Sequence, residues 1–174
     1  MLEVLISMVI VLLGVLGLAG LIVRSNQAEL ESYQRVQATI LLQDMVDRIN
    51  ANRKVATCYS NGGAGMTLTG AAVTPACATG TAEQQARAIA DLTAWNDLLG
   101  GSAEVAGTSK IGAMIGARGC INQIDATNNI YMVSVAWQGL ATTAAPGNIC
   151  GTGQYTDEKL RRVVSATLRI AVLL

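Results

Sequence analysis

An uninterrupted apolar segment at the N-terminus constrains the fold of this chain more than any other feature. Twenty residues, from Val4 to Val23, include only one polar side chain, that of Ser7. As a helix the segment is about 30 Å long, which is the thickness of the hydrocarbon core of a bilayer. A signal peptide is the alternative, but its apolar part is usually about 7–15 residues long and follows basic residues, and none precedes this run. The sequence therefore predicts a membrane-spanning helix over residues 1–23.

The composition argues against conventional enzyme chemistry. The 174 residues include no His, so His-based acid–base catalysis, Ser–His or Cys–His nucleophile pairs and His-containing metal sites are excluded. Twelve Lys and Arg balance twelve Asp and Glu, which gives no electrostatic reason to expect nucleic acid as a partner, although the composition leaves that question open. No nucleotide-binding fingerprint or metal motif occurs. We expect no enzyme activity, no catalytic residue, no cofactor and no metal.

The N-terminal helix is predicted to continue beyond the apolar segment. Residues 25–52 contain neither Pro nor Gly, so a separate anchor followed by an unrelated helix would need a break that the sequence does not supply. Apolar side chains recur there at helical spacing. We expect one helix of about fifty residues, about 75 Å long, whose amphipathic half over residues 24–56 packs one face on a domain formed by residues 57–174. The apolar positions are Val36, Ile40, Leu41, Met45, Val46 and Ile49.

A second helix and several strands are expected in residues 57–174. Residues 59–80 are loop-rich, and Thr81 with Gln84 forms a capping-box pattern that begins a helix ending at Gly100. Strands are expected over residues 130–138 and 161–174, with a further strand within residues 111–121. Helices followed by strands favour an α+β fold with an antiparallel sheet. In the strand over residues 130–138, one face would carry Tyr131, Val133, Val135 and Trp137.

Four cysteines predict two disulfide bonds. Their spacing is not CxxC, and without His a zinc site would need four thiolates from scattered loops. Disulfides suit the oxidising side of a membrane. The sequence does not separate the three possible connectivities; we expect the sequential one, because it closes the shortest loops. The expected pairs are Cys58 with Cys77 and Cys120 with Cys150.

Two groups of charged residues admit more than one interpretation. Glu3 lies at the start of the apolar helix, where the helix dipole stabilises a negative charge and where the roughly 2.5–3.5 kcal/mol cost of central burial is mostly avoided. The residue alone therefore leaves a functional and a purely structural role open. Asp157 and Glu158 are adjacent carboxylates, but Arg161 and Arg162 follow them closely. This second group predicts a solvated charge cluster rather than a catalytic pair.

The N-terminal run MLEVLISMVIVLLGVLGLAGL resembles the signature of type IV pilins. Further segments resemble the PilV-type minor pilins, often called type IV pilus modification proteins: ADLTAWNDLL followed by glycines, YMVSVAWQG, and CG with RRVVSATLRI. The resemblance covers nearly the whole chain and implies the pilin fold. Aligning Glu3 with the invariant glutamate, the fifth mature residue of the family, implies that two residues before Met1, together with the leader and cleavage site, are missing here. The helix lacks the proline that major pilins commonly carry, which fits a minor subunit.

The resemblance also implies a function. In the family, the carboxylate that Glu3 matches pairs with the N-terminal amine of a neighbouring subunit, and such an ion pair in a low-dielectric bundle would fix helix register. The chain would be a minor pilin of the inner membrane, single-pass with a periplasmic domain, that enters the pilus-initiating or tip complex. Implied partners are other minor pilins, the major pilin, the inner-membrane assembly machinery and prepilin peptidase. The alternatives are a type II secretion pseudopilin and, from another class, a membrane-anchored periplasmic binding domain or enzyme.

Overall fold

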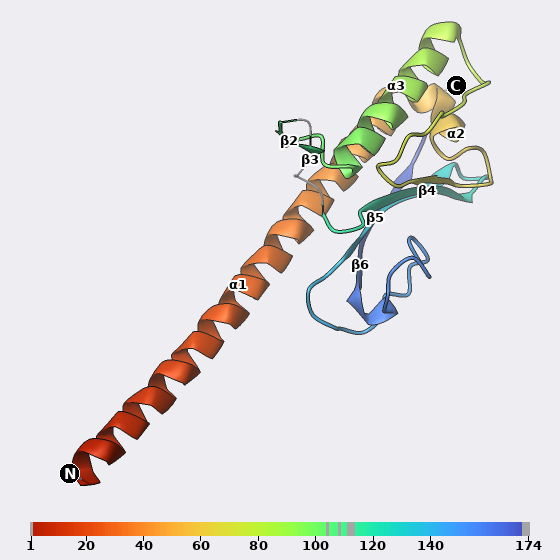
Figure 1. Ribbon diagram of the computed structural model, residues 1–174. Helices are drawn as coiled ribbons and strands as arrows, with labels where there is room; N and C mark the ends of the chain where they lie inside the picture. The colour runs from red at the N-terminus through yellow and green to blue at the C-terminus, as the bar shows by residue number, and fades with distance from the viewer. Residues whose placement is uncertain (1, 104, 108, 111–113, 172–174) are drawn as a thin grey trace. The chain divides into compact units, whose positions relative to one another are not determined.

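A long helix, a second helix and an antiparallel sheet form the α+β fold that the sequence predicts (Figure 1). The computed structural model describes residues 2–103, 105–107, 109–110 and 114–171. The chain divides into two compact units, residues 1–34 and residues 35–174. The boundary between the units falls inside the first helix.

Helix α1 runs without interruption from Leu2 to Ala51, which confirms the predicted continuous helix of about fifty residues. In the first unit, every large apolar side chain between Leu2 and Val23 is exposed, with exposed fractions of 52–73%. The helix therefore presents an apolar surface that its own unit leaves uncovered. A surface of this length and composition suits lipid or other apolar helices.

In the second unit, α1 buries one face against the domain. Ala38, Leu42, Met45 and Ile49 follow a four–three–four spacing and are at most 6% exposed. Leu41 and Val46 are partly buried beside them. The predicted apolar face is wrong at Val36 and Ile40, which are 56% and 59% exposed. Each lies two residues before a buried position, which is about 200° around a helix, so these two side chains point away from the core.

Helix α3, Ala82–Leu99, packs antiparallel to this part of α1. The Trp95 indole N–H donates to the Leu41 carbonyl at 2.8 Å. Arg48 pairs with Asp91 at 3.2 Å, and Asn52 donates to the Gln84 carbonyl at 2.9 Å. The residue numbers of the partners on α3 therefore decrease as those on α1 increase, which shows that the two helices run in opposite directions. The predicted capping box is present, since Thr81 accepts from the Gln84 N–H and the Gln84 side chain accepts from the Thr81 N–H.

Two short helical segments turn the chain after α1. They are the 3₁₀ helix η1, Arg53–Val55, and the helix α2, Ala56–Tyr59. Their side chains Val55, Ala56 and Tyr59 are buried in the main core. The chain then enters the loop-rich region that the sequence predicts.

The sheet has four antiparallel strands in the order β1-β4-β5-β6. The predicted strand within residues 111–121 is displaced, since β4 covers residues 118–125, and residues 111–113 lie outside the described part. Strand β6 ends nine residues into the predicted span, and residues 172–174 also lie outside the described part. A separate two-stranded sheet joins β2 to β3. The bounds are β1 Met66–Leu68, β2 Val105–Ala106, β3 Ser109–Lys110, β4 Arg118–Asp125, β5 Ile130–Gln138 and β6 Arg161–Arg169.

Both faces of β5 are covered. The predicted inward face is confirmed, since Tyr131, Val133, Val135 and Trp137 all lie in the core together with side chains of α1 and α3. Gly119 of the neighbouring β4 carries no side chain because an added Cβ would overlap the Trp95 ring. On the opposite face, a second small cluster is formed by Cys120, Ala136 and Cys150, with Val163 packed against it. That cluster lies under the segment 139–160, which connects β5 to β6.

Candidate assembly site

The first unit places a single carboxylate at the start of its apolar helix. Glu3 lies in the first turn of α1, and its side chain is exposed. Ser7, the only polar side chain of the apolar run, directs its hydroxyl at the carbonyls of Glu3 and Val4, at 2.8 and 3.0 Å. The Ser7 hydroxyl is therefore satisfied inside the helix. Within the described residues, no hydrogen bond or ion pair involves the Glu3 carboxylate.

Three glycines on α1 are not required by the fold of the chain itself. A Cβ added at Gly14, Gly17 or Gly20 would meet no atom within 4 Å in the described structure. Glycine in a helix interior costs about 1 kcal/mol relative to alanine. Small residues allow two apolar helices to approach closely. The glycines are consistent with packing against another helix.

A buried polar network fixes the helices of the second unit to one another. The Tyr59 hydroxyl donates to Asp91 at 2.7 Å and accepts from the Asn52 amide at 3.3 Å. Arg48 and Arg87 also contact Asp91, at 3.2 and 3.4 Å. Burial, followed by the hydrogen bond to Asp91, raises the pKa of Tyr59 well above its usual range. These contacts position α3 and α2 on α1 and serve the architecture.

Sequence reasoning did not find this network, although one signal for it exists. Asp91 lies three residues after Ala88 and four before Trp95, so it occupies the apolar face of α3. A carboxylate on such a face needs a buried partner. The identity of that partner, Tyr59, comes from a distant part of the chain and is visible only in the fold.

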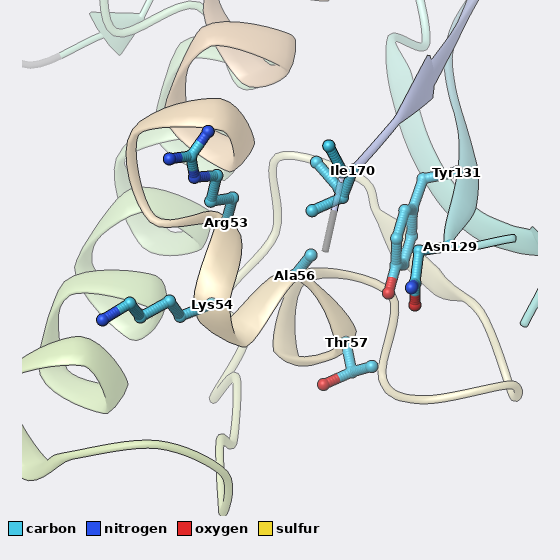
Figure 2. Close-up of a pocket in the computed structure, with 8 residues that line it drawn as sticks. Arg53, Lys54, Ala56, Thr57, Asn129, Tyr131 and Ile170 are labelled. Carbon is cyan, nitrogen blue, oxygen red and sulfur yellow. The ribbon is translucent and has the colours of Figure 1, made fainter. Parts of the chain in front are cut away.

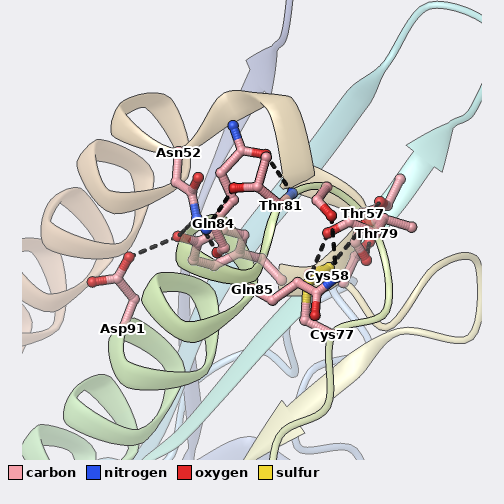
Figure 3. Close-up of a disulfide and its surroundings, with 12 residues drawn as sticks. Asn52, Thr57, Cys58, Cys77, Thr79, Thr81, Gln84, Gln85 and Asp91 are labelled. Atoms are coloured by element: carbon pink, nitrogen blue, oxygen red, sulfur yellow. Dashed lines mark hydrogen bonds between the residues drawn. A yellow bond between two sulfur atoms is a disulfide. The ribbon is translucent and has the colours of Figure 1, made fainter.

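Both disulfides expected from the sequence are present in the second unit. Cys58 bonds to Cys77, with their Cα atoms 5.0 Å apart, and joins α2 to the loop before α3. Cys120 bonds to Cys150, with their Cα atoms 5.9 Å apart, and joins β4 to the segment 139–160. No cysteine is free. Figure 3 shows the first disulfide next to Thr79, whose hydroxyl lies 3.0 Å from the Cys58 sulfur.

The charge cluster at the start of β6 is not fully solvated, and this prediction is wrong for Arg161. Its side chain is only 3% exposed and donates to Glu158 Oε2 at 2.6 Å. It also donates to the carbonyls of Pro146, Asn148 and Cys150. The backbone N–H of Gly153, and then the Arg161 guanidinium, lower the pKa of Glu158. Arg161 thus holds the segment 139–160 in place, which is a structural role.

A cavity of about 310 Å³ lies between η1, the β4–β5 turn and the end of β6 (Figure 2). Tyr131, Asn129 and Ile170 lie on one side of it, whereas the Lys54 side chain extends away from them. The described residues that line it include no carboxylate and no thiol. The cavity therefore lacks an acid–base or nucleophilic pair in its described lining.

Comparison with known proteins identifies one similarity. Residues 20–93 match the family described as Tt1218-like, type IV pilin Tt1218. The matched region extends from the middle of α1 through both short helices and the first disulfide into α3. No curated protein and no solved structure shows significant similarity to the chain.

This match supports the type IV pilin superfamily for the chain. The α1 segment in the first unit is long and apolar enough to cross a membrane, and together with the match it fits membrane anchoring with a final location in the pilus.

Proposed function

We propose that this chain is a minor pilin of a type IV pilus, active in assembly initiation or in the tip complex. It is held in the inner membrane by residues 1–23, with its domain in the periplasm, before it enters the pilus. Its partners are other minor pilins, the major pilin and the assembly machinery. The observation that carries the proposal is the exposed apolar surface of α1, with one carboxylate, Glu3, at its start.

The mechanism is non-covalent. In an apolar helix bundle, an unpaired carboxylate is penalised and a matched positive charge is attracted strongly. Pairing of Glu3 with the N-terminal amine of a neighbouring subunit would select one register among many that the apolar surface allows. Val36 and Ile40, exposed on the face of α1 opposite the domain, supply further apolar contact area.

The test replaces Glu3 with Leu in the full chain expressed in its own host. Removal of a charge can only ease partitioning into lipid, so we expect normal abundance in the inner membrane. We expect pilus number, and co-purification with other pilins, to fall at least about tenfold, which corresponds to about 1.4 kcal/mol of lost interaction.

Glu29→Leu is the matched control, because Glu29 is an exposed carboxylate on the same helix beyond the apolar run. This variant is expected to assemble normally. Normal assembly of the Glu3→Leu variant would refute the ion-pair role. Loss of protein secretion with intact piliation would instead favour a type II secretion pseudopilin.

A further inference from the structure

The cavity between η1, the β4–β5 turn and the end of β6 has the size and position of a small-molecule site (Figure 2). All of its described lining belongs to the second unit. Its volume of about 310 Å³ is at the lower end of the range of about 300–1,000 Å³ that is typical of such sites. Arg53, Lys54 and Ala171 on its lining are exposed, so a solute can reach it from the solvent.

The polar part of the described lining offers hydrogen-bond donors and no carboxylate. These donors come from η1, α2, the β4–β5 turn and β5, and they are Arg53, Lys54, Thr57, Asn129 and Tyr131. Among the residues that the structure describes, neither Arg53 nor Lys54 has an ion-pair partner. Two unpaired cations beside neutral donors favour an anionic occupant.

Tyr131 supplies a buried donor whose proton is not used by the fold. The residue is 1% exposed, and its hydroxyl accepts from the Gln123 amide at 3.2 Å. In the described part of the chain, its own O–H has no acceptor. Burial raises the pKa of Tyr131, so the hydroxyl keeps its proton at neutral pH. Buried tyrosine hydroxyls ordinarily find a partner, and an acceptor bound in the cavity would provide one. Figure 2 shows this hydroxyl next to Asn129 at the side of the cavity.

The carboxylate of the neighbouring β4–β5 turn is already engaged. Asp125 accepts from the backbone N–H and from the side-chain amide of Asn128, at 3.0 and 2.7 Å. These hydrogen bonds lower the pKa of Asp125 and hold its carboxylate within the turn. Arg169 lines an adjoining hollow that shares Asn129 and Ile170 with the cavity, and it adds a third positive charge to this end of the domain.

The remaining part of the described lining is apolar and consists of Ala56, Ile170 and Ala171. An inorganic anion would leave these side chains without a contact, whereas an organic anion would bury apolar surface against them. A carboxylate also matches the planar fork of a guanidinium, because it can accept two parallel hydrogen bonds. Since the Lys54 side chain extends away from Tyr131 (Figure 2), Arg53 is the cation assigned to the ligand.

We propose that this cavity binds a small organic carboxylate, whose oxygens accept hydrogen bonds from Arg53, Tyr131 and Asn129. The apolar body of the ligand packs on Ile170 and Ala56. Binding is non-covalent, and no reaction follows. The site goes beyond the proposed role in pilus assembly and is independent of the N-terminal carboxylate.

The probe is benzoate, titrated into the full chain in detergent micelles while the backbone amide signals of Thr57 and Asn129 are followed by NMR. Benzamide has nearly the same shape without the charge, and inorganic phosphate has the charge without the apolar body. We expect benzoate to bind saturably with a Kd on the order of 1 mM, as is usual for so small a ligand. Both comparison solutes should bind at least about tenfold more weakly.

Variants of η1 test the assigned cation. Arg53→Gln should weaken benzoate binding at least about tenfold, because a charge-assisted pair is lost, and it should leave the weaker binding of benzamide unchanged. Lys54→Gln is the matched control, since it removes the adjacent cation of the same element, and it should change the Kd for benzoate less than about threefold.

Variants of the opposite side test the neutral donors. Tyr131→Phe keeps the buried ring and should weaken benzoate binding at least about fivefold, because one donor is lost. Asn129→Gly should weaken it to a similar extent. Asn129 has a φ of 52°, a conformation that glycine adopts freely, so this variant removes the amide without backbone strain. The indole signal of the buried Trp95 reports whether each variant keeps its fold.

Four results would overturn the proposal. They are the absence of a saturable shift up to about 20 mM benzoate, equal affinity for benzoate and benzamide, phosphate binding as tight as that of benzoate, and a loss of affinity in Lys54→Gln without a loss in Arg53→Gln.

Discussion

Tyr59 illustrates how single residues hold the second unit together. Its phenol, at the end of α2, is fully buried, and its hydroxyl both donates to Asp91 of α3 and accepts from Asn52, the residue after α1. Burial, with the hydrogen bond to Asp91, raises its pKa above the ordinary value of 10.0. Tyr155 donates to the Gly116 carbonyl at 2.9 Å, and burial raises the pKa of Tyr155 to about 12. Both phenols stabilise the fold only while they keep their protons.

Alkaline pH should therefore destabilise the domain. Below pH 10.0 the phenols are protonated in both states, and the stabilisation is fully present. Above pH 10.0, tyrosines ionise in the unfolded chain before they ionise in the folded protein. The free energy of unfolding therefore declines as the pH rises towards the pKa values of the folded protein. We expect the melting temperature, followed by near-ultraviolet circular dichroism in detergent, to be flat up to about pH 10 and to fall beyond it.

The Tyr59→Phe variant tests the origin of this decline. It should lose about 1–2 kcal/mol at neutral pH, because the hydrogen bonds of the hydroxyl with Asp91 and with Asn52 are both deleted. Asp91 keeps its contacts to Arg48 and Arg87. Its decline above pH 10 should be shallower than that of the unaltered protein. Tyr33→Phe is the control, since Tyr33 is exposed. An unchanged alkaline slope in Tyr59→Phe would assign the effect to other groups.

At the scale of elements, each disulfide fastens a loop-rich segment, residues 60–78 or residues 139–160, to a helix or strand of the second unit. The Cys58–Cys77 bond encloses a separation of 19 residues around β1, and the Cys120–Cys150 bond encloses a separation of 30 residues that includes β5. The second bond also anchors the segment 139–160, which covers the outer face of β5.

Removal of either disulfide should destabilise the domain and release a different segment. Replacing both cysteines of a pair with alanine should cost about 3 kcal/mol for the first bond and a few tenths more for the second, because a longer loop leaves the unfolded chain more freedom. Limited proteolysis should then cut within residues 60–78 in the first variant and within residues 139–160 in the second. The same cleavage pattern in both variants would show that the restraints are not local.

The elements that could be predicted from the sequence are those defined by local signals. Helix α1 follows from unbroken helical spacing, and α3 follows from the Thr81 capping box and the terminal Gly100. Strand β1 was missed because its three residues become a strand only through pairing with β4. The position of β4 was displaced for the same reason, since pairing with β5 fixes its limits at Arg118 and Asp125.

The residues of the candidate site also differ in whether local sequence signals reveal them. Glu3 is conspicuous in the sequence because it interrupts an apolar run. Val36 and Ile40 were assigned to the buried face because helical spacing reports apolar positions but not which of two faces a domain will cover. The burial of Arg161 depends on carbonyls of the segment 139–160, whose course no local pattern specifies.

At the scale of the whole molecule, the apolar run and the domain are separable. The core begins at Ala38, and residues 24–174 carry 23 of the 24 charged residues. Deletion of residues 1–23 should therefore give a soluble fragment that keeps both disulfides and the buried environment of Trp95. Fractionation and near-ultraviolet circular dichroism check this expectation. A fragment that still partitions quantitatively into membranes would contradict a single anchor.

The antiparallel contact between α1 and α3 has a mechanical consequence. A pull along α1 from its N-terminal end reaches the domain through contacts spread over several turns, at Leu41–Trp95, Arg48–Asp91 and Asn52–Gln84. These contacts lie side by side along the two helices, so tension loads them together in shear instead of peeling them apart in turn. Separation of α1 from α3 then requires these contacts to break together. A protein built in this way transmits a pulling force from α1 to its domain without unfolding step by step from the end at which the force is applied.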